Sequence, residues 1–78
     1  MGNLKPKLRL DNNLHVLRAT MKITQAELAD AIGVTRATVN AMERGDYNPS
    51  LELAFRLSLY FKKNIHEIFT VGVENEKN

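Results

Sequence analysis

Two short helical segments separated by a glycine restrict the fold of this chain more than any other feature. Residues 25–32 and 35–45 each show apolar side chains at helical spacing. Gly33 between them supplies the left-handed backbone conformation that other residues adopt only with strain. Ala29 faces inward where a larger side chain is usual, which favours a close helix crossing. The sequence therefore predicts two packed helices joined by a tight turn.

Capping residues define where these helices begin. Thr24 and Glu27 form a capping box, in which the threonine oxygen accepts from the Glu27 amide and the carboxylate reaches back. Thr35 is the expected cap of the next helix, and Gly45 ends it.

The second of these helices has two unlike faces. Val39 and Met42 can be buried on one side. The opposite face carries two cations, one amide and two methyl groups: Arg36, Ala37, Asn40, Ala41 and Arg44. Such a face cannot build a core, but it suits the base edges and phosphates of a DNA groove.

Similar signals predict three more helices. Asn12 is the expected N-cap of the first, which runs to about Lys22. Ser50 caps a helix over residues 51–61, and a short last helix begins after Asn64. Five helices joined by short turns predict an all-α domain over residues 12–69.

The two ends of the chain carry weaker signals. Residues 3–10 alternate polar and apolar side chains, which predicts a short strand, although a solvated basic tail is equally compatible. Residues 70–73 alternate weakly, so the ends can pair as a two-stranded sheet, within one chain or between two. We therefore divide the chain into an N-terminal arm or strand (1–11), the helical domain (12–69) and a C-terminal strand or tail (70–78).

Composition excludes several classes of protein. With 78 residues and no cysteine, the chain has neither disulfides nor a cysteine-ligated zinc site to support a small core. No apolar stretch is long enough to span a membrane, so we expect a cytoplasmic protein. The net charge of +2 is compatible with a nucleic-acid partner without demonstrating one.

The stretch T-Q-A-E-L-A-D-A-I-G-V-T-R-A-T-V-N-A-M-E-R-G (24–45), followed by Y-N-P-S-L-E-L-A (47–54), resembles a known family. It is similar to the helix-turn-helix family of phage repressors of the Cro and C1 type, including small stand-alone prokaryotic members. The resemblance covers residues 12–69. It implies a five-helix domain that inserts helix 35–44 into the major groove of double-stranded DNA. It further implies a sequence-specific transcriptional regulator, usually a repressor and a homodimer, that needs no cofactor or metal.

The resemblance also assigns roles to individual positions. Base contacts fall on Arg36, Ala37, Asn40 and Ala41. Phosphate contacts fall on Gln25, Thr35, Thr38, Arg44, Tyr47 and Asn48. Arg18 and Glu43 stand where the family commonly has an internal ion pair, and an acid facing DNA would repel phosphate.

Each base contact has a plainer alternative. Arg36 can form a bidentate pair with guanine O6 and N7, contact a phosphate, or stay solvated. Asn40 can pair with adenine N6 and N7 or stay solvated. Ala37 and Ala41 can only touch a thymine methyl group. We therefore expect specificity to depend also on DNA shape, dimer spacing and water.

Some positions depart from the family pattern. Asp46 stands where relatives often carry lysine, which argues against a phosphate contact there. Lys62 stands where relatives often end the fourth helix with glycine, so either it is left-handed or the helix runs longer. Phe55 and Leu59 are apolar residues that could mark a dimer surface, as could the terminal strands.

Other functions have less support. His15 and His66 have no nucleophile or acid nearby in sequence, and no glycine-rich phosphate loop occurs, so we do not expect an enzyme. The alternative is a protein-interaction module, such as an antitoxin-like or adaptor domain on the same fold. Such a module should show large apolar anchors on the outward face of helix 35–44.

Overall fold

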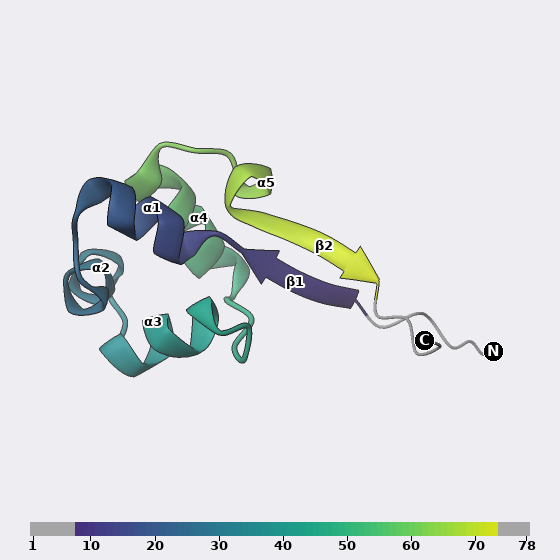
Figure 1. The fold of residues 1–78 in the computed structure, drawn as a ribbon, viewed down its shortest axis with the longest axis horizontal. Helices are drawn as coiled ribbons and strands as arrows, with labels where there is room; N and C mark the ends of the chain where they lie inside the picture. Colours follow the sequence, from purple (N-terminus) through teal and green to yellow (C-terminus); the bar gives the residue numbers. More distant parts are fainter. Residues whose placement is uncertain (1–7, 74–78) are drawn as a thin grey trace.

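The computed structural model describes residues 8–73, in which five helices follow a first strand in the chain and precede a second one (Figure 1). The elements, in order, are β1 (Leu8–Asn12), α1 (Leu14–Met21), α2 (Gln25–Ile32), α3 (Arg36–Glu43), α4 (Leu51–Phe61), α5 (Ile65–Ile68) and β2 (Phe69–Val73). The five predicted helices are confirmed, as is the pairing of the chain ends. Residues 3–7 of the predicted first strand lie outside the described residues.

The predicted capping side chains start three of the helices. Thr24 Oγ1 accepts from the Glu27 amide at 3.0 Å, and Glu27 Oε1 accepts from the Thr24 amide at 2.8 Å. Thr35 caps α3 through the Thr38 amide, and Ser50 caps α4. These bonds satisfy N–H groups that no helical carbonyl can reach.

The start of α1 differs from the prediction. Its N-cap is Asn13, and the assignment of Asn12 as the cap is wrong because Asn12 is the last residue of β1. The side-chain amide of Asn12 makes two hydrogen bonds. Its Oδ1 accepts from the backbone N–H of Leu14 at 3.0 Å, and its Nδ2 donates to the backbone carbonyl of Met42 at 2.8 Å. Asn12 thus joins the strand, α1 and the end of α3.

The core lies between the helices, and each of the five contributes at least one buried apolar side chain to it. The fully buried side chains with the largest volumes are Leu14, Leu28, Val39, Met42, Leu57 and Ile68. Ala29 is also buried, as the prediction of a close α2–α3 crossing requires. Met21 lies at helical spacing from Leu14 and Leu17, but it is 45% exposed because α1 ends there.

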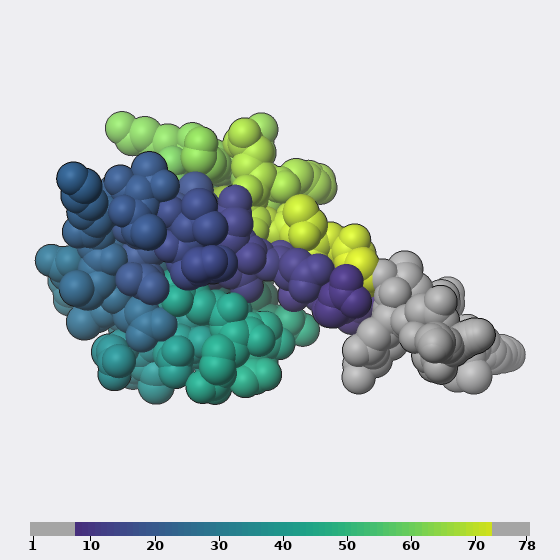
Figure 2. All heavy atoms as spheres, in the orientation of Figure 1, coloured from purple at the N-terminus to yellow at the C-terminus, as the bar shows by residue number. Residues whose placement is uncertain are grey.

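The two strands pair antiparallel within one chain, with Leu8 opposite Val73 and Asn12 opposite Phe69. The ladder extends away from the helices (Figure 1) and appears as a narrow projection in Figure 2. An isolated two-stranded ladder is marginally stable in water. Here the end of the ladder next to the helices is fixed, because Phe69 packs against the core and the backbone N–H of Asn13 donates to the Ile68 carbonyl at 3.1 Å.

The fourth helix ends at Phe61, and Lys62 adopts the left-handed conformation with φ 59°. Of the two alternatives for Lys62, the structure therefore supports a helix that stops there. Lys22 ends α1 in the same conformation. Both lysines occupy positions where glycine would be unstrained.

Candidate nucleic-acid interface

Hydrogen bonds fix the conformation of the turn between α2 and α3, and so the direction of α3 relative to α2. Gly33 has φ 80°, and the amides of Gly33 and Val34 both bond the Ala29 carbonyl, at 2.9 and 3.0 Å. Arg56 of α4 donates from Nη1 to the Ile32 carbonyl at 3.1 Å. A Cβ at Gly33 would lie 2.8 Å from that nitrogen, which is the mobile end of a side chain, so glycine is required there mainly by its positive φ.

The two faces predicted for α3 are present. Val39 and Met42 are buried in the core. Arg36 and Ala37 are exposed, while Asn40 and Ala41, one turn later, are half-buried. All four predicted base-contacting residues therefore lie on the side of α3 away from Val39 and Met42.

The two arginines of this region differ in their surroundings. Arg36 is exposed, and no residue from 8 to 73 makes a hydrogen bond or ion pair with its side chain. Arg44 is also exposed, but its Nε lies 3.0 Å from Asp46 Oδ2. Among residues 8–73, none of the Arg36 donors is thus taken up, whereas Arg44 shares one with a carboxylate.

The remaining predicted phosphate-contacting residues flank α3. Thr35 and Thr38 lie at its start with their hydroxyl oxygens 3.0 Å apart. Tyr47 and Asn48 are exposed in the loop between α3 and α4. Gln25 is the first residue of α2, but its side chain is turned toward α3 rather than outward.

Arg18 and Glu43 form the predicted internal ion pair between α1 and α3. Arg18 Nε donates to Glu43 Oε2 at 2.8 Å, and Nη2 donates to Oε1 at 3.1 Å. Arg18 also donates to the Ile23 carbonyl. The Glu43 side chain is only 9% exposed, so it belongs to the fold and not to the outward face.

The ion pair shifts the pKa of both of its groups. Burial alone would raise the pKa of the Glu43 carboxyl, but the hydrogen bonds from Arg18 and Gln25 and the positive charge of Arg18 outweigh it, so the pKa is lowered. The hydrogen bond to Glu43 in turn raises the pKa of Arg18. Glu43 is therefore ionised at neutral pH.

Gln25 connects this ion pair to the outward face of α3. Its Nε2 donates to Glu43 Oε1 at 3.1 Å and to Asn40 Oδ1 at 3.3 Å. The sequence analysis missed this link. The capping box places Gln25 at the start of α2, but its contact with Asn40 depends on how α2 crosses α3, which no local pattern encodes.

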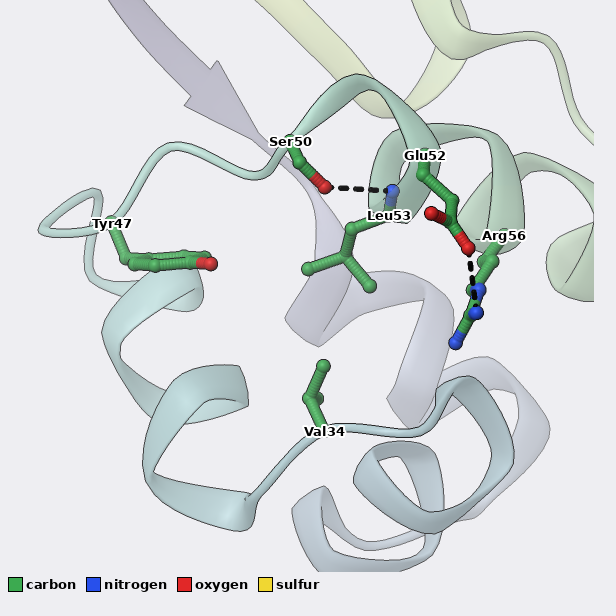
Figure 3. Close-up of a pocket in the computed structure, with 6 residues that line it drawn as sticks. All are labelled: Val34, Tyr47, Ser50, Glu52, Leu53 and Arg56. Carbon is green, nitrogen blue, oxygen red and sulfur yellow. Dashed lines mark hydrogen bonds and ion pairs between the residues drawn. The ribbon is translucent and has the colours of Figure 1, made fainter.

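An open hollow of about 200 Å³ lies beside this region, lined by Val34, Tyr47, Ser50, Glu52, Leu53 and Arg56 (Figure 3). Glu52 and Arg56 bond each other at 2.6 Å on one wall. The hollow therefore has no net charge, and Arg56 is directed to the α2–α3 turn. We assign its residues to positioning the turn.

Comparison with known proteins identifies a helix-turn-helix domain, in agreement with the arrangement of α2, the turn at Gly33 and α3. Residues 14–68 match the model of the helix-turn-helix family. The chain belongs to that family, of the Cro and C1 type. The resemblance predicted from residues 24–54 is thereby confirmed.

Similar chains of the family come from archaea and bacteria. An uncharacterized HTH-type transcriptional regulator of Methanocaldococcus jannaschii is 43% identical over 60 residues, covering 77% of this chain and 91% of the relative. The HTH-type regulator YgzD of Bacillus subtilis is 39% identical over 66 residues, covering 85% and 100%. The crystal structure of the transcriptional regulator VanUg has a TM-score of 0.74 at 24% identity, covering 95% of this chain and all of VanUg. That likeness shows a shared fold.

Among residues 8–73, no helix is long and apolar enough to cross a membrane. Within the same range, no three acidic, histidine or cysteine side chains gather as metal ligands. His15 and His66 are both exposed.

Proposed function

We propose that this protein is a sequence-specific DNA-binding transcriptional regulator that inserts α3 into the major groove of double-stranded DNA. The observation that supports this most is the outward face of α3, where Arg36 has no protein partner among the described residues while the helix itself is tied to the core. A free guanidinium on a rigid helix is suited to base edges and phosphates. Family membership agrees with this function.

We further propose that it acts as a repressor in the cytoplasm. A small domain that occupies an operator excludes other proteins from the same DNA, and this alone is enough to repress. Its relatives are named as regulators of transcription, without a stated sign.

The contacts divide into two sets. Arg36, Ala37, Asn40 and Ala41 face the bases. Thr35, Thr38, Arg44, Tyr47 and Asn48 contact phosphates around them, together with Gln25. For Gln25 the backbone N–H at the start of α2 is the available donor, because both hydrogens of its side-chain amide are directed to Glu43 and Asn40.

Selection of bound sequences from random DNA tests the function. We expect a defined motif, with affinity that falls steeply as salt rises because bound counterions are released. Arg36→Ala should relax the preference at one position per half-site, at a cost of about 1–3 kcal/mol. Lys63→Ala, a cation in the turn between α4 and α5, is the matched control and should leave the motif unchanged.

Two results would separate the alternatives. If Arg36→Ala weakens binding equally to all sequences, Arg36 contacts a phosphate. If no DNA is selected, or if binding does not depend on salt, the proposed function is wrong. The alternative would then be a protein-interaction module on the same fold.

We propose that the active form is a homodimer on a two-fold site, with half-site centres about 34 Å apart. Two surfaces are candidates for the interface. On α4, Leu51, Phe55 and Leu59 are 71%, 52% and 76% exposed at helical spacing. On the strands, Leu8 and Val71 are 60% and 63% exposed.

Sedimentation with and without DNA distinguishes the two surfaces. Phe55→Ser with Leu59→Ser should give a monomer if α4 forms the interface, and Leu8→Ser should do so if the strands form it. A wild-type protein that stays monomeric even on DNA would contradict the homodimer.

A further inference from the structure

The fourth helix carries an apolar stripe on the side that faces away from the core. The side chains that α4 buries in the core are Leu53, Ala54, Leu57 and Phe61. On the opposite side, Leu51, Phe55 and Leu59 follow one another at every fourth position, and each is more than half exposed. We call these three residues the α4 stripe. A contiguous exposed apolar patch of this kind marks an interaction surface.

The α4 stripe is symmetric about its middle residue. Leu51 and Leu59 stand four positions before and four positions after Phe55. A two-fold axis through Phe55 therefore places each leucine of one protomer against the other leucine of its partner, with the two copies of Phe55 in contact at the centre. The stripe is self-complementary in this antiparallel arrangement, so a second copy of the chain fits it.

The charges beside the stripe agree with an antiparallel contact between identical surfaces. On one flank Glu52 Oε2 and Arg56 Nη2 lie 2.6 Å apart, so the two charges compensate each other within one protomer. Lys62 follows the stripe at the end of the helix. Parallel helices would bring the two copies of Lys62 together, whereas antiparallel helices separate them by about 20 Å. Like charges are thus kept apart only when the helices run antiparallel.

The size of the stripe determines the strength of the contact. An apolar patch on a monomer covers roughly 300–600 Å², whereas each partner of a stable complex buries about 800 Å². Three side chains on a helix of 11 residues belong to the smaller class. We therefore expect an equilibrium between monomer and dimer, which a DNA with two half-sites shifts toward the dimer by holding two copies close together.

We propose that two copies of this chain associate through the α4 stripe as antiparallel helices, with Phe55 on the two-fold axis. This inference rests on the homodimer of the proposed function and adds its surface, direction and strength. The strand ladder is the weaker candidate, because Leu8 and Val71 offer two exposed aliphatic side chains and no aromatic one. Aromatic residues are enriched at the centres of interfaces.

Engineered cysteines test the direction of the helices, because the chain has no cysteine of its own. Leu51→Cys and Leu59→Cys are prepared separately and mixed at about 1 mM, where even a weak dimer is populated. A disulfide requires Cα atoms within about 7 Å, so it forms between residues that face each other. The mixture should form the mixed disulfide at least about tenfold faster than either variant alone forms its own.

Two control variants carry the cysteine on other exposed apolar positions. Val16→Cys lies on α1, where Val16 is 50% exposed, and Leu8→Cys lies on the strand ladder. Both should cross-link more slowly than the mixture. Cross-linking of Leu59→Cys alone at the rate of the mixture would indicate parallel helices and would overturn the inference. An equal rate in either control would also overturn it.

Opposite charges at position 55 test the two-fold axis. A residue on the axis meets its own copy, so Phe55→Glu and Phe55→Lys should each weaken self-association by about tenfold or more. An equal mixture of the two variants should recover the dimer, because opposite charges then meet. Sedimentation measures the association, and circular dichroism should show an unchanged fold because Phe55 is exposed. A mixture that associates no better than the separate variants would contradict the place of Phe55.

These measurements contain no DNA, so they separate this inference from the proposed function. A wild-type protein that stays monomeric at about 1 mM would overturn the inference, and the α4 stripe would then be a surface for a different protein. The selection of bound DNA would be unaffected by that result. If the cross-links form as expected but no DNA is selected, the α4 contact is supported and the proposed function is wrong.

Discussion

Two arginine–carboxylate pairs lie at the end of α3, and they differ in solvent exposure and in the number of hydrogen bonds that join them. The Arg18–Glu43 pair has side chains that are 21% and 9% exposed and is bonded through two nitrogens. The Arg44–Asp46 pair, only one to three residues further along, is 58% and 63% exposed and bonded through Nε. Water surrounds the second pair and is largely excluded from the first.

The comparison shows that burial, and not residue type, determines whether an arginine–carboxylate pair in this region stabilises the fold. Breaking a buried pair leaves an uncompensated charge in a poorly solvated place, whereas an exposed pair contributes little because water replaces either partner. Glu43 therefore serves the fold. Arg44 and Asp46 remain available to modulate the attraction of a phosphate.

The largest expected effect comes from breaking the inner pair. Glu43→Ala should lower the free energy of unfolding by about 1–3 kcal/mol, between the values for exposed and for buried pairs, because the pair is only partly buried. Chemical denaturation of the variant and the wild type measures this. An unchanged unfolding midpoint would show that the pair does not hold α1 against α3.

A smaller effect should appear on acidification. Because the pKa of Glu43 is lowered by folding, its contribution to stability is complete above its unfolded pKa of about 4.3 and is lost as the pH falls through the lower folded value. The stability advantage of the wild type over Glu43→Gln should therefore shrink as the pH falls below about 4. Thermal melting of both proteins from pH 7 to pH 3 measures it, and a constant difference would contradict the assignment.

The outer pair should instead affect binding. Asp46→Asn removes a negative charge near the proposed phosphate contacts and frees Arg44 Nε, so DNA affinity at low salt should rise about two- to fivefold, the range of an exposed ion pair. Titration of a selected DNA measures the change. Glu52→Gln, an exposed acid paired with Arg56 on α4, is a control of equal charge change. A similar gain in that control would show that only net charge matters.

The smallest expected effect completes the comparison. Asp46→Ala should change the free energy of unfolding by no more than about 0.5 kcal/mol, as for other exposed pairs. Denaturation under the conditions used for Glu43→Ala gives the value. A loss as large as that of Glu43→Ala would remove the distinction between the two pairs.

The sequence predicted the features that depend on local chemistry. The Thr24–Glu27 capping box, the bounds of α2, the cap at Thr35 and the left-handed Gly33 are all determined within a few residues. The Arg18–Glu43 pair was predicted from the resemblance to a family, since no local pattern joins residues 25 positions apart.

The features that escaped prediction depend on tertiary position. Asn12 and Asn13 are both good capping residues, and the choice between them follows from β2, which pairs with Asn12. Gln25 was expected to face a phosphate, but the crossing of α2 over α3 brings its side-chain amide to Glu43 and Asn40.

The pairing of β1 with β2 also has a consequence for how the chain folds. Leu8 lies opposite Val73, so this ladder closes a loop of almost the whole described chain, whereas the helices form from near neighbours. Closing a long loop costs conformational entropy that short-range contacts do not require, which places the ladder among the late events of folding. A circular permutant that joins residues 8 and 73 through a short turn would convert this slowest contact into a local hairpin. Such a chain should fold faster than the natural order of elements.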